Sequence, residues 1–442
     1  MDSIDITEEE SNSQKTILKK IDLKIVPLVT FLYMISYLDR ISIGNTKLEH
    51  LESDLGLTDN QYNWALCSFF FGYILFEVPS NLILYKVKQR LSIWISAILL
   101  ACGIVMILMI FVKNFFTIMI ARFLLGVFEA VLIPGMIYYI TIWYRRSEQN
   151  YRVGAILSGP TFAGALSGLL SYAIISLLDS KAGLRGWQWI FLACGIITII
   201  VSIIAYFLIF DSVENVKWLD KEERKRVSTG IKRDELQYTE EITKDLKVCV
   251  SMFIFCGISV ATYSFSFFIP SIINGFVLSQ LLVVPPFMLG CISEIGVAFL
   301  SNRVNLRGPF VILFASIGIF GYAIVGTIQS NAIRAFPCRA TSTTWLANNI
   351  APSLKRNIGI SLTVGSGGIG GIIASQIYRS VDYPNYTFGH LISSSCLFLA
   401  VCLSIIQFAI LKNNNQKMKV QRKKIRRAVS WNLESGEFVP DL

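Results

Sequence analysis

Long apolar stretches separated by short polar segments recur along most of this chain. Many have about the 20 residues that one helix needs to cross the hydrocarbon core of a bilayer. We therefore predict membrane-spanning helices in the first half at about Ile25 to Leu38, Trp64 to Tyr85, Leu91 to Val112, Phe116 to Tyr139, Val153 to Leu178 and Trp189 to Phe210.

The second half repeats the pattern with one weak position. Spans are predicted at about Val248 to Ile269, Leu281 to Leu300, Pro309 to Ile328, Asn357 to Tyr378 and His390 to Leu411. The stretch between Gln329 and Ile350 holds Arg334, Arg339 and Pro337 and is too polar to span on hydropathy alone. A crossing there is still needed to keep the later basic segments on one side, so we expect twelve spans with a poorly formed tenth.

Composition supports a protein that lives in lipid. Hydrophobic residues make up 53% of the chain, charged residues 16%, and the mean hydropathy is +0.56. A water-soluble fold is excluded by these values. The sequence predicts an all-α polytopic membrane protein with a tail at 1–24, a six-helix bundle at 25–210, a loop at 211–247, a second six-helix bundle at 248–411 and a basic tail at 412–442.

The net charge of +10 is unevenly distributed, and its distribution predicts the topology. Bases gather in the amino-terminal tail, in alternate short loops and in the tail at 412–442. Basic segments stay on the cytoplasmic side and contact anionic lipid, so both termini are expected in the cytoplasm. Membrane lipid is thus a partner, and nucleic acid is not. The plasma membrane is the expected location, with the vacuole or endoplasmic reticulum as alternatives.

Cysteine and histidine usage argues against metal and cofactor chemistry. Eight of the nine cysteines lie in or beside apolar stretches, no CxxC pair occurs, and His50 and His390 are the only histidines. We therefore expect no metal site and no cofactor. No nucleophile and base stand at a recognisable spacing, so an enzyme is not expected.

Ionisable side chains inside spans are the candidates for function, because each costs about 2.5 to 3.5 kcal/mol at a helix centre. They are Glu77, Arg122, Glu129 and Glu294. Arg122 and Glu129 are two helical turns apart and share one face. We predict that Arg122 binds a substrate carboxylate and that Glu129 or Glu77 carries a proton. The alternative is a structural polar cluster that ties the fourth span to its neighbours.

Other polar residues extend this site. Asn81 follows Glu77 by one turn in a span interrupted by Pro79, and it could bind substrate or satisfy freed carbonyl groups. Tyr138 and Gln376 are further candidates for hydrogen bonds to substrate. Asp39 and Arg40 are predicted as a helix-end ion pair or a gating contact.

An internal repeat links the two halves. Trp143-Tyr-Arg-Arg146 and Arg152-Val-Gly-Ala precede a span rich in small residues, and Trp345-Leu-Ala-Asn-Asn349 and Arg356-Asn-Ile-Gly-Ile precede another. Two repeated halves are typical of secondary transporters whose substrate site lies at the midplane between them.

Five motifs, in order along the chain, resemble those of the allantoate permease family. They are Tyr37-Leu-Asp-Arg-Ile-Ser-Ile-Gly-Asn45, Phe71-Gly-Tyr-Ile-Leu-Phe-Glu-Val-Pro-Ser-Asn-Leu82, Ala121-Arg-Phe-Leu-Leu-Gly-Val-Phe-Glu-Ala130, Gly186-Trp-Gln-Trp-Ile-Phe191 and Gly370-Gly-Ile-Ile-Ala-Ser-Gln-Ile-Tyr378. These are fungal transporters of the anion:cation symporter group within the major facilitator superfamily. The resemblance covers about Lys20 to Leu411.

The resemblance implies a major facilitator fold and proton-driven uptake of a small organic anion, such as a vitamin, a ureide, an amino-acid derivative or a peptide, by alternating access. The second half departs from the family pattern. The connection between Ile273 and Pro285 is short, and so is the region from Thr327 to Thr344. A homologue that has lost transport and acts as a membrane nutrient sensor is therefore the alternative.

Overall fold

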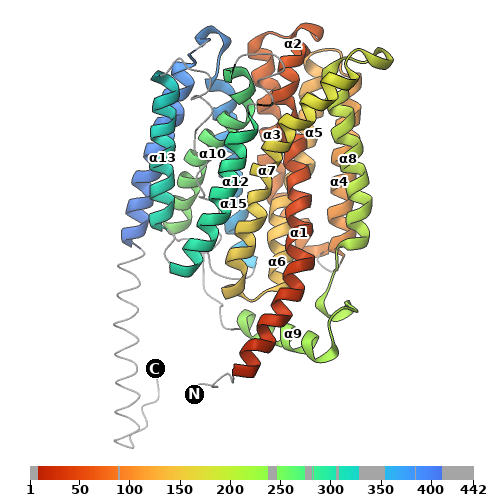
Figure 1. The fold of residues 1–442 in the computed structure, drawn as a ribbon, viewed down its shortest axis with the longest axis vertical. Coiled ribbons are helices and arrows are strands. Elements are labelled where there is room, and N and C mark those ends of the chain that lie inside the picture. The colour runs from red at the N-terminus through yellow and green to blue at the C-terminus, as the bar shows by residue number, and fades with distance from the viewer. Residues whose placement is uncertain are drawn as a thin grey trace, which may run out of the picture.

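The computed structural model describes residues 8–87, 90–236, 246–273, 281, 283–304, 308–327, 354–383 and 385–410. These residues form helices joined by short connections, and no strand occurs among them. Figure 1 shows the helices standing side by side, with the short helix α2 at one end of the molecule and α9 at the other. We call these the α2 end and the α9 end.

The first half supplies an N-terminal bundle. Its long helices are α1 (Glu8–Thr46), α3 (Asp59–Val87), α4 (Leu91–Leu108), α5 (Phe115–Glu129), α6 (Leu132–Trp143), α7 (Arg146–Leu178) and α8 (Gly186–Leu208). Short elements connect them: η1 (Lys47–Glu49), α2 (Leu51–Asp54), η2 (Met109–Phe111) and η3 (Lys181–Gly183). After η4 (Val213–Asn215) comes α9 (Lys221–Leu236), which falls in the predicted central loop.

The second half supplies a C-terminal bundle. Its described helices are α10 (Leu246–Ile273), α12 (Val284–Val304), α13 (Gly308–Thr327), α15 (Leu354–Ile377) and a last helix, Thr387–Ile410, which follows η5 (Ser380–Asp382). Each of these helices corresponds to a predicted span. The doubtful tenth span, the short connection after Ile273 and the basic tail lie outside the described residues. The predicted domain boundaries stay predictions.

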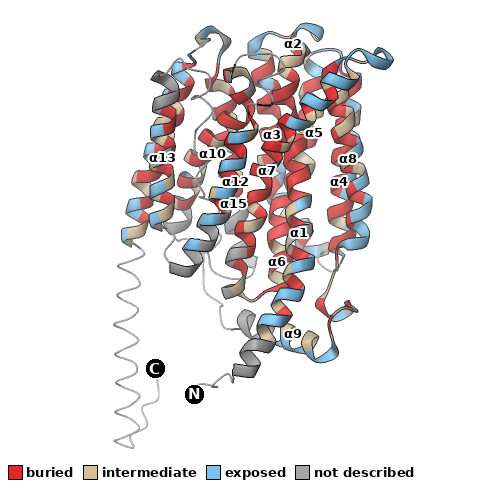
Figure 2. Cartoon of the chain, in the orientation of Figure 1, coloured by how far each residue is buried: buried red, intermediate tan, exposed pale blue. Residues whose placement is uncertain are grey.

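The outer surface of the bundles is apolar. Eight helices in the described part of the chain are long and apolar enough to cross a membrane. Large side chains that point outward include Phe207, Phe111 and Phe320, which are 73%, 71% and 70% exposed. Buried residues line the inner faces of the helices, whereas exposed ones lie on outward faces such as those of α4 and α8 (Figure 2). Such a surface is expected to face lipid, because exposing so large an apolar area to water is unfavourable.

Two predicted spans differ from the observed helices. The first extends to Thr46, so Asp39 and Arg40 lie within α1 rather than at its end. The fourth span is broken into α5 and α6 at Ala130 and Val131. Pro134 explains the break, because it lacks the N–H that would bond to Ala130 and its ring crowds that carbonyl group. The break leaves Glu129 as the last residue of α5.

Helices α3 and α5 approach so closely that only glycine fits at their crossing. A Cβ atom on Gly126 would overlap the carbonyl oxygen of Phe69, and one on Gly72 would overlap that of Phe123. Small residues at helix crossings let backbones pack closely in membranes, where van der Waals contact replaces the hydrophobic effect as the main attraction between helices. This crossing sets the distance between α3, which carries Glu77, and α5, which carries Arg122 and Glu129.

We expect Gly126→Ala to destabilise the N-terminal bundle, because the backbones of α3 and α5 must separate to admit the methyl group. Overpacking of this kind costs about 1 to 3 kcal/mol. The measurement is the thermal unfolding midpoint of purified protein in detergent. Gly296→Ala is the matched control, because a Cβ atom there meets no other atom within 4 Å. Equal midpoints for the two variants would contradict this account of the crossing.

Helix α9 is attached to the N-terminal bundle. Trp218 stacks on Trp143 with ring centroids 5.8 Å apart, and the Lys24 ammonium lies 5.2 Å from the Trp218 ring. Lys20 Nζ donates to Glu223 Oε1 at 2.7 Å, and this bond lowers the pKa of Glu223. The ion pair therefore supports docking of α9 above the ordinary pKa of a glutamate, and this support is lost as the pH falls through the lowered value. Because the pair is solvent-exposed, its contribution is small.

Candidate substrate and proton site

A buried ion pair between α1 and α5 forms the centre of the candidate site. Arg40 donates to Glu129 Oε2 from Nη2 at 2.7 Å and from Nε at 2.9 Å. The side chains are only 2% and 0% exposed. Removing two charges from water costs several kcal/mol each, so such a pair is maintained only when each member compensates the other. The sequence prediction that Arg40 pairs with Asp39 was therefore wrong about the partner.

Arg40 also reaches the C-terminal bundle. Its Nη1 donates to the hydroxyl oxygen of Tyr263, in α10, at 2.9 Å. The guanidinium lies over aromatic rings, 5.0 Å from the centroid of Phe69 and 5.1 Å from that of Tyr73. Aromatic faces attract cations and also exclude water, which strengthens the electrostatic interactions of the group. Arg40 is thus a cation that contacts both bundles and has one counter-ion, Glu129, in the described part of the chain.

Arg122 is buried inside the N-terminal bundle. Its Nη1 donates to the backbone oxygen of Arg40 at 3.1 Å, and its guanidinium lies 5.8 Å from the centroid of the Phe191 ring. The Nε and Nη2 atoms are buried and make no hydrogen bond with the described residues. Arg122 and Glu129 therefore converge on Arg40, as their shared helical face predicts. The structure adds Arg40 as the link between them.

Asp39 faces away from Arg40 toward α8. Its Oδ2 accepts a hydrogen bond from the Thr198 hydroxyl at 2.7 Å, and its Oδ1 has no partner among the described residues. Consecutive residues of a helix point about 100° apart, which explains why Asp39 and Arg40 meet different helices. The site thus holds two carboxyl groups and two guanidinium groups within the buried interior.

Glu77 is a third buried carboxyl group, and its surroundings are different. It is 1% exposed, and neither carboxyl oxygen has a hydrogen-bond partner among the described residues. It faces α15, where a Cβ atom on Gly365 would lie 2.8 Å from Glu77 Oε2. Asn81 does not bond to this carboxyl group, because its Nδ2 donates to the backbone oxygen of Glu77 at 2.7 Å. That bond is a local one, made one turn back in α3 and not to the Leu75 carbonyl group that Pro79 leaves without its N–H donor.

The remaining candidates lie on different helices. Gln376, in α15, donates from Nε2 to Cys67 Sγ of α3 at 3.0 Å and so joins the two bundles. Tyr138 is half-buried in α6. Sequence reasoning missed Tyr263 and Thr198, which partner Arg40 and Asp39. A hydroxyl group within an apolar span was the only signal available for each, and it does not identify the partner.

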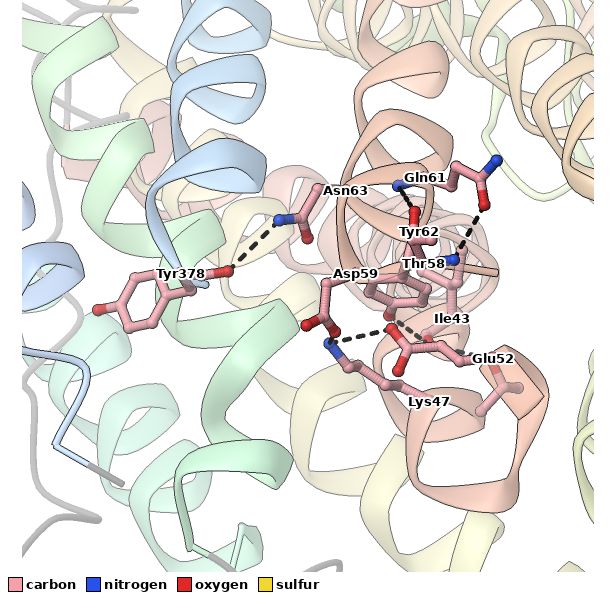
Figure 3. Close-up of polar contacts among 10 residues, drawn as sticks. Ile43, Lys47, Glu52, Thr58, Asp59, Gln61, Tyr62, Asn63 and Tyr378 are labelled. Carbon is pink, nitrogen blue, oxygen red and sulfur yellow. Dashed lines mark hydrogen bonds and ion pairs between the residues drawn. The ribbon is translucent and has the colours of Figure 1, made fainter. Parts of the chain in front are cut away.

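Polar contacts join the helices at the α2 end, as Figure 3 shows. Lys47 Nζ lies 3.1 Å from Glu52 Oε1 and 3.7 Å from Asp59 Oδ1, so it ties together the connection from α1 to α3. Asn63 Nδ2 donates to the backbone oxygen of Tyr378 at 3.4 Å and joins α3 to the end of α15. The two bundles are therefore in contact at this end of the molecule.

Comparisons with known proteins identify the family. Residues 29–403 match the model of the Major Facilitator Superfamily. The chain is 30% identical to an uncharacterized transporter of Schizosaccharomyces pombe, over 94% of this chain and 87% of that protein. It is also 30% identical to a high-affinity nicotinic acid transporter of Saccharomyces cerevisiae, over 92% of this chain and 79% of that protein.

Solved structures agree on the fold. The xylose transporter XylE from E. coli, in a partially occluded inward-open conformation, superposes with a TM-score of 0.67 at 14% identity. The match covers 87% of this chain and 97% of XylE. At this identity the likeness concerns the fold, whereas the match to the family model spans most of the chain. The protein is an integral membrane protein that belongs to the major facilitator superfamily of secondary transporters, and it is not an enzyme.

Proposed function

We propose that this chain is a proton-coupled symporter of a small organic anion, within the allantoate permease branch of the superfamily. The observation that carries the proposal is the buried Arg40–Glu129 pair, whose arginine also contacts Tyr263 of the other bundle. We assign anion binding to Arg40, because it reaches the face between the bundles. Arg122 holds the α1 backbone at Arg40 and adds positive potential.

The pair couples the anion to a proton by competition. An ionised Glu129 occupies two N–H groups of Arg40. A proton taken up from water neutralises Glu129 and leaves the guanidinium without its counter-ion, which is costly in a buried site. A substrate carboxylate then replaces Glu129, since arginine binds carboxylates through a planar pair of donors. Loss of the proton restores the Glu129 pair and expels the anion.

The contact between Arg40 and Tyr263 connects this exchange to alternating access. A ligand shifts the equilibrium between two states only as far as it binds them differently. A substrate bound to Arg40 has Tyr263 beside it in one arrangement of the bundles and loses that contact when they rock apart. Gln376, Tyr138 and Asn81 are proposed to hydrogen-bond the rest of the substrate, and Glu77 is proposed as a second proton carrier.

Charge supports a proposed orientation, and we propose the plasma membrane as the location. The basic amino-terminal region and α9 are at the same end of the molecule (Figure 1). Basic segments remain in the cytoplasm, so we place the α9 end and both termini there. The chain then takes up its substrate across the plasma membrane, entering from the α2 end. The proton gradient across that membrane, acidic outside, has the direction that this coupling needs.

The test is transport by purified protein in liposomes with an acidic exterior and a neutral interior. Nicotinate is the first probe, because the relative from Saccharomyces cerevisiae is named for nicotinic acid; ureides, other vitamins and amino-acid derivatives follow. We expect accumulation of one labelled anion that collapses when a protonophore dissipates the gradient. Accumulation unaffected by the protonophore would refute proton coupling. Binding of an anion without any transport would favour the nutrient sensor.

A further inference from the structure

A small polar cavity lies between helix α9 and the connection that precedes it. Its volume is about 360 Å³, which falls in the range of small-molecule sites, about 300 to 1,000 Å³. The residues that line it are Lys221, Arg224, Lys225, Ser228 and Thr229 of α9 and Glu214 of η4. Three bases and two hydroxyl groups therefore share the cavity with a single acid.

The bases that line the cavity follow one face of α9. Lys221, Arg224 and Lys225 stand at positions i, i+3 and i+4, and Ser228 continues the row at i+7. Residues at this spacing are neighbours on a helix surface, and like charges among them repel one another. The sequence of α9 thus concentrates positive charge beside the cavity.

The acids in the first turn of α9 do not balance these bases. Glu223 accepts a hydrogen bond from Lys20 Nζ at 2.7 Å, and Glu222 lines a separate, larger cavity. Lys221 and Lys225 form no ion pair with any residue in the described part of the chain. Their charges are therefore available to a ligand.

Arg224 is held in place by the backbone. Its Nε donates to the backbone oxygen of Leu219 at 2.9 Å, and its Nη1 donates to that of Glu214 at 3.0 Å. Within the described residues it has no carboxylate partner. A guanidinium that two neutral carbonyl groups hold in place keeps its charge, and the N–H groups that these bonds leave over can bind an anion in a fixed geometry.

Two hydroxyl groups continue the same surface. Serine and threonine within helices commonly donate to a carbonyl group of the preceding turn, as Ser158 does to the backbone oxygen of Ala155 at 2.7 Å. Ser228 and Thr229 form no hydrogen bond with other residues that the structure describes. Their hydroxyl groups can therefore donate to a ligand in the cavity.

These groups match a phosphate monoester better than a carboxylate. A phosphate monoester carries about two negative charges at neutral pH and three strong acceptor oxygens, and arginine and lysine bind it well. Glu214 would repel a ligand that is anionic throughout, but its carboxylate can accept hydrogen bonds from hydroxyl groups. The ligand that fits is a polyol, such as a sugar or an inositol ring, with a phosphate group attached.

We propose that the α9 cavity binds a phosphorylated polyol, with its phosphate monoester on Lys221, Arg224 and Lys225. Two sources share this chemistry: the headgroup of an inositol phospholipid, and a soluble sugar or inositol phosphate. Either ligand relieves the repulsion among the bases and ties α9 to η4, so this part of the connection between the bundles becomes more stable when the cavity is occupied. The inference is independent of the proposed function, because it needs no transported anion.

The test is limited proteolysis by trypsin of the purified full chain in phosphatidylcholine nanodiscs, where both ends of the molecule are accessible. Mass spectrometry follows cleavage of the peptide bonds after Arg224 and Arg226. Glucose phosphate and inositol trisphosphate are the soluble probes, and nanodiscs that contain a phosphatidylinositol phosphate are the lipid probe. Free inositol and nanodiscs that contain phosphatidylserine are the controls, because neither has a phosphate monoester.

We expect the phosphate probes to slow cleavage of both bonds, because trypsin needs the helix to open and the ligand binds only the folded site. The rate should fall by a factor of one plus the ratio of probe concentration to Kd, about tenfold when that ratio is about ten. Protection by the soluble probes alone would assign the site to soluble phosphates, and protection by the lipid probe alone would assign it to a phospholipid.

The double variant Lys221→Gln, Lys225→Gln should lose this protection. It also removes repulsion between like charges, so α9 should resist trypsin at least as well as native without a ligand. Lys217→Gln is the matched control: Lys217 is exposed and lies outside the cavity, so protection should be retained. Protection that persists in the double variant, equal protection by the two controls without a monoester, or no protection by any phosphate probe would each overturn the proposal.

Discussion

Replacing Arg40 with alanine should abolish transport of the anion, although the protein should still insert into the membrane. The change removes the group assigned to the substrate carboxylate and leaves Glu129 buried without its cation. Truncating one partner of a buried, hydrogen-bonded charge pair costs about 2 to 5 kcal/mol of binding free energy, which corresponds to a loss of roughly 30-fold or more in substrate affinity. The measurement is initial uptake in liposomes, normalised to reconstituted protein.

Two variants make the result interpretable. Arg40→Lys keeps the charge but lacks the planar pair of donors that binds Glu129 at 2.7 and 2.9 Å, so we expect uptake well below native. Lys181→Ala removes an exposed base near the α2 end and should transport normally. If Arg40→Ala retains uptake while Arg122→Ala loses it, then Arg122 receives the substrate and Arg40 is structural.

Glu129→Gln should separate exchange from accumulation. The amide preserves the shape of a protonated glutamate but cannot release a proton, so Arg40 stays available to the substrate on both sides of the membrane. We expect exchange of internal for external substrate to continue at close to the native rate. Accumulation driven by a pH gradient should be lost, because the amide has no proton to release and so cannot expel the anion from Arg40. The two measurements use the same liposomes with and without internal substrate.

The pH dependence of exchange tests whether Glu129 carries the coupling proton. In the native chain, exchange should fall as the pH rises, because ionised Glu129 recaptures Arg40. In Glu129→Gln this decline should disappear. Asp39→Asn is the comparison, since Asp39 bonds to Thr198 rather than to Arg40 and its removal should leave the decline in place. A native pH profile in Glu129→Gln would exclude Glu129 as the coupling group.

The candidate site could be predicted in part because membranes penalise charge. Glu77, Arg122 and Glu129 were recognisable as the few ionisable side chains in apolar stretches, and all three are buried. Arg40 was not predicted to bind substrate, because the apolar stretch of the first span ends at Leu38. The helix nevertheless continues to Thr46. A charge that pairs inside the bundle does not end a helix, and hydropathy alone cannot distinguish that case from a charge at the interface.

The amino-acid sequence by itself determined the fold class and the superfamily. Apolar length and the ordered motifs can be read along the chain alone, and the bilayer converts apolar length directly into spans. Only the tertiary structure decided that Glu129 pairs with Arg40, that Arg40 meets Tyr263, and that Glu77 of α3 faces Gly365 of α15. These pairings join residues from distant parts of the chain, and they depend on how helices rotate and cross, which helical periodicity leaves undetermined.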